Sequence, residues 1–340
     1  MKKTIYISIS LLFTLSSVGQ IKNEEEQRDL AFNNSVNKWF TAWELVSKDI
    51  YKIDKVRPVD FVFFDDKYVY STSNVTIEKG TIVKGHNLME LKLNWKKKLH
   101  DNQLTLPDKS VVQINLMSFA SRTSDKNNES FLIMPLPDFW RKSGVTSDEF
   151  GTENLATGVF IHEFCHAQQM HSFGRKVTEY EKANNFGVVF SDDIVQYIFD
   201  KDSTYLKGFN KEVDLLYSSI QNNSVNKKSV KEGLALIKQR QKKYFKREYK
   251  DFNQLDDLFL TMEGLGQYSM YLWLTNPDGG NIKKEIAIQG VRRTRKWWSQ
   301  DEGFSLFLIL DKLSETKKWG KDMFGDKPEN VTELIDGLVN

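Results

Sequence analysis

The hydrophobic pattern of this chain of 340 residues changes its period near Gly151. Before that point, short runs rich in β-branched and aromatic residues predict strands at 59–65, 67–77, 110–121 and 130–137. After it, apolar residues recur about every 3.6 positions, which predicts helices for most of the remaining chain. Strands followed by helices are typical of the α+β class, so we expect an α+β fold with a small mixed or antiparallel sheet.

Helices are expected at 188–200, 211–221, 228–250, 255–275 and 301–313, and one more precedes the strands, from Glu24 to about Tyr51. A further helix carries two histidines and is expected to end at Gly174. This order predicts an N-terminal lobe, residues 20–175, with the sheet and the histidine helix. A helical C-terminal lobe, residues 176–340, is expected to follow.

Two of the expected strands are predicted to pair with each other. The segment RTSDKNN joins the strands at 110–121 and 130–137, and its polar, turn-forming residues favour an antiparallel hairpin. Pro135 and Pro137 interrupt the second strand. Because proline cannot donate a hydrogen bond to a neighbouring strand, we expect this strand at an edge of the sheet.

The first residues, MKKTIYISISLLFTLSSVGQ, have the composition of a secretory signal peptide. Two lysines precede an apolar run from Ile5 to Leu15, and the small residues Ser17 and Gly19 predict cleavage after Gly19. The apolar run is shorter than the roughly 20 residues of a membrane span, although an uncleaved anchor is the alternative. We expect a bacterial protein, secreted or periplasmic, whose mature chain has no stable membrane span.

Charge and cysteine content leave the function to a local site. The 48 basic and 46 acidic residues nearly balance, so no strong field indicates a nucleic acid or an anionic membrane as partner. The single cysteine, Cys165, excludes an intramolecular disulfide, and we expect its side chain to be buried in the core.

Residues 161–170, IHEFCHAQQM, place His162 and His166 four positions apart, with Glu163 beside the first. On a helix these histidines share one face, so both imidazoles can reach one Zn²⁺ ion. A catalytic zinc also needs an open position for water, and Glu163 is placed to take a proton from that water. A helix without metal is the alternative, but two unpaired histidines in an apolar helix would carry a desolvation cost.

The HEFCH segment resembles the zincin metallopeptidases, in which two histidines bind zinc and the glutamate is the general base. This resemblance implies a zinc peptidase that cleaves peptide or protein substrates through a zinc-bound water. The longer metzincin pattern requires glycine and histidine where this chain has Gln169 and Ser172. No histidine follows His171, which lies on another helix face, so the third ligand is expected to be a carboxylate. That is the gluzincin arrangement.

Glu263 and Glu302 are the two candidates for this carboxylate. Glu263 lies in an apolar helical stretch, where an ionised carboxylate needs a strong partner, whereas Glu302 is explained by a position at a helix start. The segment EGLGQY also resembles the Glu-Gly-x-Ala-x-Tyr pattern of gluzincin-like bacterial peptidases, with Gly266 in place of alanine. The resemblance implies Glu263 as the zinc ligand and Tyr268 as a hydrogen-bond donor near the reacting atoms, although the neighbouring Tyr271 is an alternative.

Two further segments are candidates for substrate binding. In gluzincins the strand before the active helix forms the cleft rim, so the resemblance implies that FLIMPLP binds an extended peptide. A plain core-facing strand is the alternative. The basic run VRRTRKWW offers Arg292, Arg293 or Arg295 for a substrate carboxylate, unless it is only a solvated face.

We therefore expect a secreted zinc-dependent peptidase. Two other functions are compatible with the sequence: a zinc hydrolase of a non-peptide amide, and a zinc-binding protein without catalytic activity. The presence of Glu163 argues against the second, because a protein that only binds metal does not need a general base. Cleavage specificity, the choice between exo- and endopeptidase action, and oligomeric state are not predicted.

Overall fold

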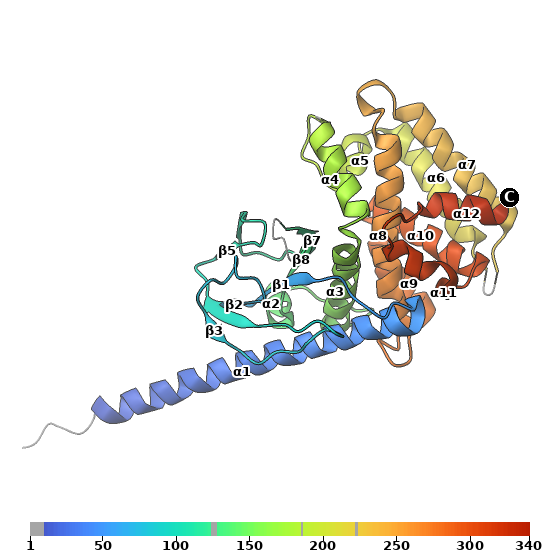
Figure 1. The fold of residues 1–340 in the computed structure, drawn as a ribbon. Coiled ribbons are helices and arrows are strands. Elements are labelled where there is room, and N and C mark those ends of the chain that lie inside the picture. Colours follow the sequence, from blue (N-terminus) through green and yellow to red (C-terminus); the bar gives the residue numbers. More distant parts are fainter. Residues whose placement is uncertain (1–9, 124–127, 185, 222–223) are drawn as a thin grey trace, which may run out of the picture.

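The computed structural model describes residues 10–123, 128–184, 186–221 and 224–340. It is a mixed α and β fold with one sheet of six strands, a separate two-stranded sheet, and a helical C-terminal part (Figure 1). The predicted α+β class is confirmed at this level.

Six strands form the main sheet, in the order β3-β4-β2-β1-β8-β7. They are β1 (Val59–Phe64), β2 (Tyr68–Ser71), β3 (Thr81–Ile82), β4 (Lys96–Leu99), β7 (Phe119–Arg122) and β8 (Ser130–Pro135). Every neighbouring pair is antiparallel except β1 and β8, which run parallel. All six residues of β1 and all six of β8 are buried, which fits their mostly apolar sequences and their central place, although β1 also buries Asp60.

The predicted hairpin is confirmed, because β7 pairs antiparallel with β8. The prediction that the second strand lies at an edge is wrong: β8 lies between β1 and β7, and β7 is the edge strand. Pro135 is the last residue of β8, so its missing N–H costs little, and the next residue, Leu136, donates to the Phe64 carbonyl at 2.7 Å. Pro137 begins helix α2 (Pro137–Lys142).

Each face of the sheet has its own cover. Helices α1 (Ser10–Glu44) and α3 (Thr152–Gln169) cover one face, where Trp39 stacks on Phe160 at 5.4 Å and Phe61 on Phe164 at 5.7 Å between ring centres. The hairpin of β5 (Gln103–Thr105) and β6 (Val111–Gln113) covers the other face, with Leu104 in its apolar cluster. The sheet therefore provides a rigid base for α3.

The predicted signal peptide, residues 1–19, falls partly outside the described residues. Residues 1–9 are not described, and the backbone from Ser10 onward belongs to α1, which continues as the π-helix η1 (Leu45–Tyr51). Within the described part of the chain, no helix combines the length and the apolar character that a bilayer span requires. Cleavage after Gly19 stays a prediction.

Helices make up the C-terminal part of the chain. They are α4 (Phe173–Ala183), α5 (Ile194–Phe199), α6 (Ser203–Ser219), α7 (Lys227–Tyr244), η2 (Arg247–Tyr249), α8 (Phe252–Thr275), α9 (Lys284–Arg292), η3 (Arg293–Arg295), α10 (Trp298–Leu313), α11 (Thr316–Trp319), η4 (Gly320–Phe324) and α12 (Val331–Val339). The longest of these, α8, packs against α3 on one side and α10 on the other. At the second contact a Cβ atom on Gly264 would lie 2.5 Å from the carbonyl carbon of Gly303, so two glycines let α8 and α10 meet closely.

Candidate metal centre

Helix α3 presents its two histidines away from the sheet and toward α8. Phe160 and Phe164 are spaced four residues apart and face α1 and the sheet. His162 and His166 follow them by two positions each, which turns them by about 200° around the helix, to the opposite side. The apolar face of α3 therefore fixes the direction in which the histidines point.

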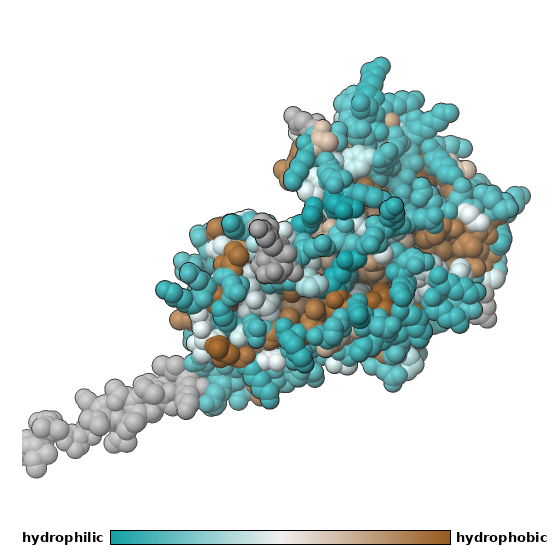
Figure 2. All heavy atoms as spheres, in the orientation of Figure 1, coloured by the Kyte–Doolittle hydropathy of each residue, from teal (hydrophilic) through white to brown (hydrophobic). Residues whose placement is uncertain are grey.

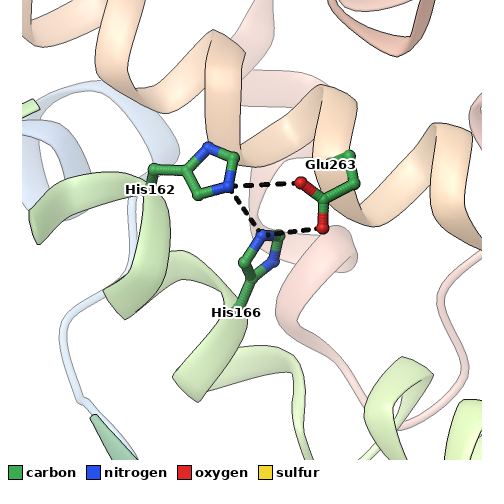
Figure 3. A group of neighbouring side chains, drawn as sticks. All are labelled: His162, His166 and Glu263. Carbon is green, nitrogen blue, oxygen red and sulfur yellow. Dashed lines mark hydrogen bonds and ion pairs between the residues drawn. The ribbon is translucent and has the colours of Figure 1, made fainter. Parts of the chain in front are cut away.

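The two histidines meet Glu263 of α8 (Figure 3). His162 Nε2 lies 3.3 Å from Glu263 Oε2, His166 Nε2 lies 3.2 Å from Glu263 Oε1, and the two Nε2 atoms are 2.9 Å apart. All three residues are buried, at 7%, 6% and 5% exposure. One ligand atom from each residue lies within 4.8 Å of the others, so this histidine–glutamate site could hold a metal ion.

The charges in the histidine–glutamate site lie close together and change one another's pKa values. Burial lowers the pKa of both histidines, and in His166 the Glu263 carboxylate outweighs that effect and raises the pKa to about 9. The pKa of His162 stays below its ordinary value, because the neighbouring His166 adds to the effect of burial. Burial raises the pKa of Glu263, but the two histidines outweigh it and bring the pKa below its ordinary value. The carboxylate is therefore ionised and ready to bind a cation.

A glycine allows this close approach of α3 and α8. A Cβ atom on Gly266 would lie 2.6 Å from His162 Nδ1, inside any ordinary contact distance. The position where the gluzincin-like pattern has alanine is therefore filled here by the one residue that leaves room for the His162 ring. The departure from the pattern has a steric reason in this chain.

Two glutamines that the sequence did not single out support Glu263. Gln300 of α10 donates from Nε2 to Glu263 Oε2 at 3.0 Å, and Gln267 donates from Nε2 to Gln300 Oε1 at 2.5 Å. Gln267 lies four residues after Glu263, so its place on the same face of α8 was a signal present in the sequence. The contribution of Gln300 depends on the contact between α8 and α10, which the sequence does not show.

Beside the histidine–glutamate site lies a cavity of about 730 Å³, which we call the main cavity. Helices α3, α8 and α9 and the segments before β7 and α3 line it, with apolar residues Leu116, Met117, Trp140, Val145, Phe150, Leu155, Val159 and Met270. His162 and Glu163 also line it. Apolar surface gathers along the middle of the face in Figure 2, between the sheet and the helical part.

Glu163 is the acidic group of the main cavity that lies next to a histidine. Burial raises its pKa to about 8, and the carboxylates of Glu263 and Asp192 add to this effect. The structure thus places the predicted general base where a water or substrate can reach both Glu163 and His162.

Tyr268 does not have the predicted place near the reacting atoms. It follows Glu263 by five residues, which puts it on the far side of α8, and its hydroxyl lies 2.8 Å from Thr316 Oγ1. Its ring stacks on Phe307 in the core. The alternative, Tyr271, also packs in the core, beside Phe304. Neither tyrosine is among the residues that line the main cavity.

Glu302 is not a helix-start residue with an exposed role. It lies in the second turn of α10 at 1% exposure, and Arg240 donates to its Oε2 at 2.9 Å. Arg240 also contacts Glu212 and Asp256, so Glu302 belongs to a buried ion cluster. That cluster, rather than a cap, is the reason for the glutamate.

The remaining predicted residues have structural roles or lie outside the site. Cys165 is fully buried, as expected, and burial raises its pKa above 9. The ring nitrogens Nδ1 and Nε2 of His171 lie 3.1 and 3.0 Å from the carbonyl oxygens of Gln168 and Gly325, and His171 does not belong to the group of His162, His166 and Glu263.

The three arginines of the basic run differ in their surroundings. Arg292 donates to Asp301 Oδ1 at 2.7 Å, and Arg295 lies 3.7 Å from Asp301 Oδ2 and contacts Asp214. Arg293 lines the main cavity. Of these three arginines, only Arg293 is among the residues that line the main cavity.

Comparisons of the chain with models of known protein families, with curated proteins and with solved structures find no match. The chemistry of the site therefore rests on its own residues.

Proposed function

We propose that the protein is a zinc-dependent hydrolase that cleaves peptide bonds, with His162, His166 and Glu263 as metal ligands and Glu163 as general base. The observation that carries the proposal is the meeting of these three side chains beside an open cavity that Glu163 also lines. Two imidazoles and one carboxylate are the ligand set that catalytic zinc takes in many hydrolases.

The spacing of the three donor atoms fits zinc. Bonds of 2.0–2.1 Å in a tetrahedral arrangement place neighbouring ligand atoms about 3.3 Å apart. The two contacts between histidine nitrogen and glutamate oxygen are 3.3 and 3.2 Å, and the contact between the two nitrogens is 2.9 Å. The donors therefore need only a small outward movement of one ring to hold the ion.

Zinc at this position would supply a water of lowered pKa and would polarise a substrate carbonyl. Glu163 accepts the proton of the attacking water and passes it to the leaving amine. Its pKa of about 8 in the absence of a cation falls when a positive charge is placed beside it, which favours the ionised form that a base requires. The main cavity is open to solvent and has apolar as well as polar lining residues, so it offers contacts for both kinds of substrate side chain.

The supporting experiment measures metal content and cleavage on one sample. We expect about one zinc per chain and cleavage of members of a mixed peptide library. Glu163→Gln should retain zinc and lose about 10²- to 10⁴-fold in rate. Glu149 lines the same cavity, so Glu149→Gln is the matched control and should keep most activity. A Glu163→Gln protein that cleaves peptides as fast as the parent would overturn the assignment of the base.

Two outcomes of this experiment would favour a different function. Zinc without hydrolysis of any peptide or amide would favour a metal-binding role, and hydrolysis of amides but not peptides would favour a different substrate.

Export belongs to the same proposal and rests on the leader-like start of the chain. N-terminal sequencing of protein from the cell envelope or medium should begin near Gln20, and recovery from the cytosol with Met1 intact would contradict export.

A further inference from the structure

The turn that carries Arg293 has an unusual backbone. Arg293, Thr294 and Arg295 have φ angles of 46°, 56° and 62°, so three consecutive residues with side chains adopt the left-handed conformation. L-residues other than glycine adopt it at a cost, and rarely in succession. Such conformations persist where the surrounding structure enforces them, and they gather at functional sites.

The neighbouring side chains enforce this turn. Before it, Arg292 donates to Asp301 at 2.7 and 3.2 Å, and its guanidinium carbon lies 3.6 Å from the centre of the Tyr217 ring. Within it, Arg295 contacts Asp301 and Asp214. The flanking arginines are therefore fixed to carboxylates on one side of the turn.

Arg293 has a different environment from its neighbours. Among the described residues, its side chain has no hydrogen bond and no ion pair within 4.0 Å, and it lines the main cavity together with His162 and Glu163. Arg293 is exposed, so its guanidinium is accessible from solvent, and its charge acts on the Glu163 carboxylate across the cavity that both residues line. The turn thus holds an unpaired guanidinium at the cavity that contains the proposed base.

We propose that Arg293 determines substrate specificity by binding a carboxylate of the peptide whose scissile bond lies at the histidine–glutamate site. The inference rests on the proposed function. A guanidinium matches a carboxylate with two parallel hydrogen bonds, and no carboxylate among the described residues is hydrogen-bonded to the Arg293 side chain. The carboxylate belongs either to the C-terminus of the substrate or to an aspartate or glutamate side chain.

The test compares peptides that differ in one charge. The probes are acetylated hexapeptides of one sequence, taken from a peptide that the protein cleaves, ending in a carboxylate or an amide and carrying glutamate or glutamine next to the scissile bond. Arg293→Ala should lower kcat/KM about 10- to 100-fold for the member with the recognised carboxylate and by less than about twofold for its neutral partner. The member that responds identifies the source of the carboxylate.

The matched control is Arg175→Ala, which removes an exposed arginine on α4 whose contact with Glu179 is 4.0 Å long. It should leave kcat/KM unchanged on all four peptides. An equal loss on charged and neutral peptides in Arg293→Ala would overturn the inference, because a merely structural role lowers both alike.

A binding measurement distinguishes failure of the proposed function from failure of the role proposed for Arg293. If the parent protein cleaves no peptide, four probes of the same design but with the sequence Ac-Ala₅ plus the variable residue are titrated calorimetrically into parent and Arg293→Ala protein. Affinity for a carboxylate-bearing probe should fall at least tenfold in Arg293→Ala, with neutral probes unaffected. Equal affinities in both proteins, or no binding of any probe at millimolar concentration, would overturn the role of Arg293.

Discussion

Replacing Gly266 by alanine tests the close contact between α3 and α8. The added Cβ would lie 2.6, 2.8 and 3.0 Å from His162 Nδ1, Cε1 and Cγ, about 0.8 Å inside an ordinary contact at its shortest. The ring belongs to His162, a proposed metal ligand that is buried on a helix packed against the sheet. It must therefore rotate, or α3 and α8 must separate.

Two opposing contributions set the expected change in stability. Glycine to alanine inside a helix stabilises by about 1 kcal/mol, and overpacking at a buried contact costs about 1–3 kcal/mol. The metal-free protein should therefore lose about 0–2 kcal/mol in its free energy of unfolding. Zinc binding should suffer more, because a displaced His162 ring no longer points at the ion, and we expect a loss of at least tenfold in affinity.

The assay combines zinc competition against a chelating indicator with chemical denaturation of the metal-free protein. Gly208 provides the control, because it lies within helix α6 and a Cβ atom there would have no neighbour within 4 Å. Gly208→Ala should stabilise by about 0.5–1 kcal/mol and leave zinc affinity unchanged. If Gly266→Ala also gains stability and binds zinc like the parent, the contact does not have the closeness described and the argument fails.

Three further outcomes follow from the same structure. Glu263→Ala should weaken zinc binding by more than a hundredfold. Glu302→Ala should lose about 3–5 kcal/mol of stability, because it breaks a buried ion cluster, but the folded protein should bind zinc normally. The reverse pattern in a zinc titration would assign the third ligand to Glu302 of α10. Burial raises the pKa of Glu163 to about 8 and, with the Glu263 charge, that of Asp192 to about 7, so the folded protein binds more protons than the unfolded chain from about pH 4 to pH 8. Its melting temperature without metal should therefore fall from pH 6 to pH 8.5, and a rise would contradict these shifts. Tyr268→Phe should cost about 0.5–1.5 kcal/mol in a denaturation experiment and leave kcat within about twofold, and a large loss of kcat would restore a role at the reacting atoms.

The group of His162, His166 and Glu263 could be predicted because the signals for it are local. The spacing of His162 and His166 follows from helix geometry alone. Glu263 could be singled out because an ionised carboxylate in an apolar helix needs a partner, and the structure brings it to both histidines. In these cases the sequence shows buried polar side chains that need a partner, and the fold brings those side chains together.

The errors arose where the answer depends on distant residues. Glu302 was interpreted from its neighbours in sequence, but its partner Arg240 lies 62 positions away. Pro135 favours an edge strand by its missing N–H, but a proline at the last position of an inner strand gives the same sequence pattern. The left-handed turn at 293–295 contains no glycine, so no propensity rule predicts it.

The parallel pairing of β1 with β8 has a consequence for the order in which the chain can fold. Val59 of β1 pairs with Ser130 of β8. Strand β1 therefore gains its second neighbouring strand only after about 70 further residues have left the ribosome. Until then the buried, apolar β1 has an open edge, which invites pairing with other chains. Fragments that end before Ser130 should therefore aggregate, whereas fragments that extend past β8 have both neighbours of β1 in place.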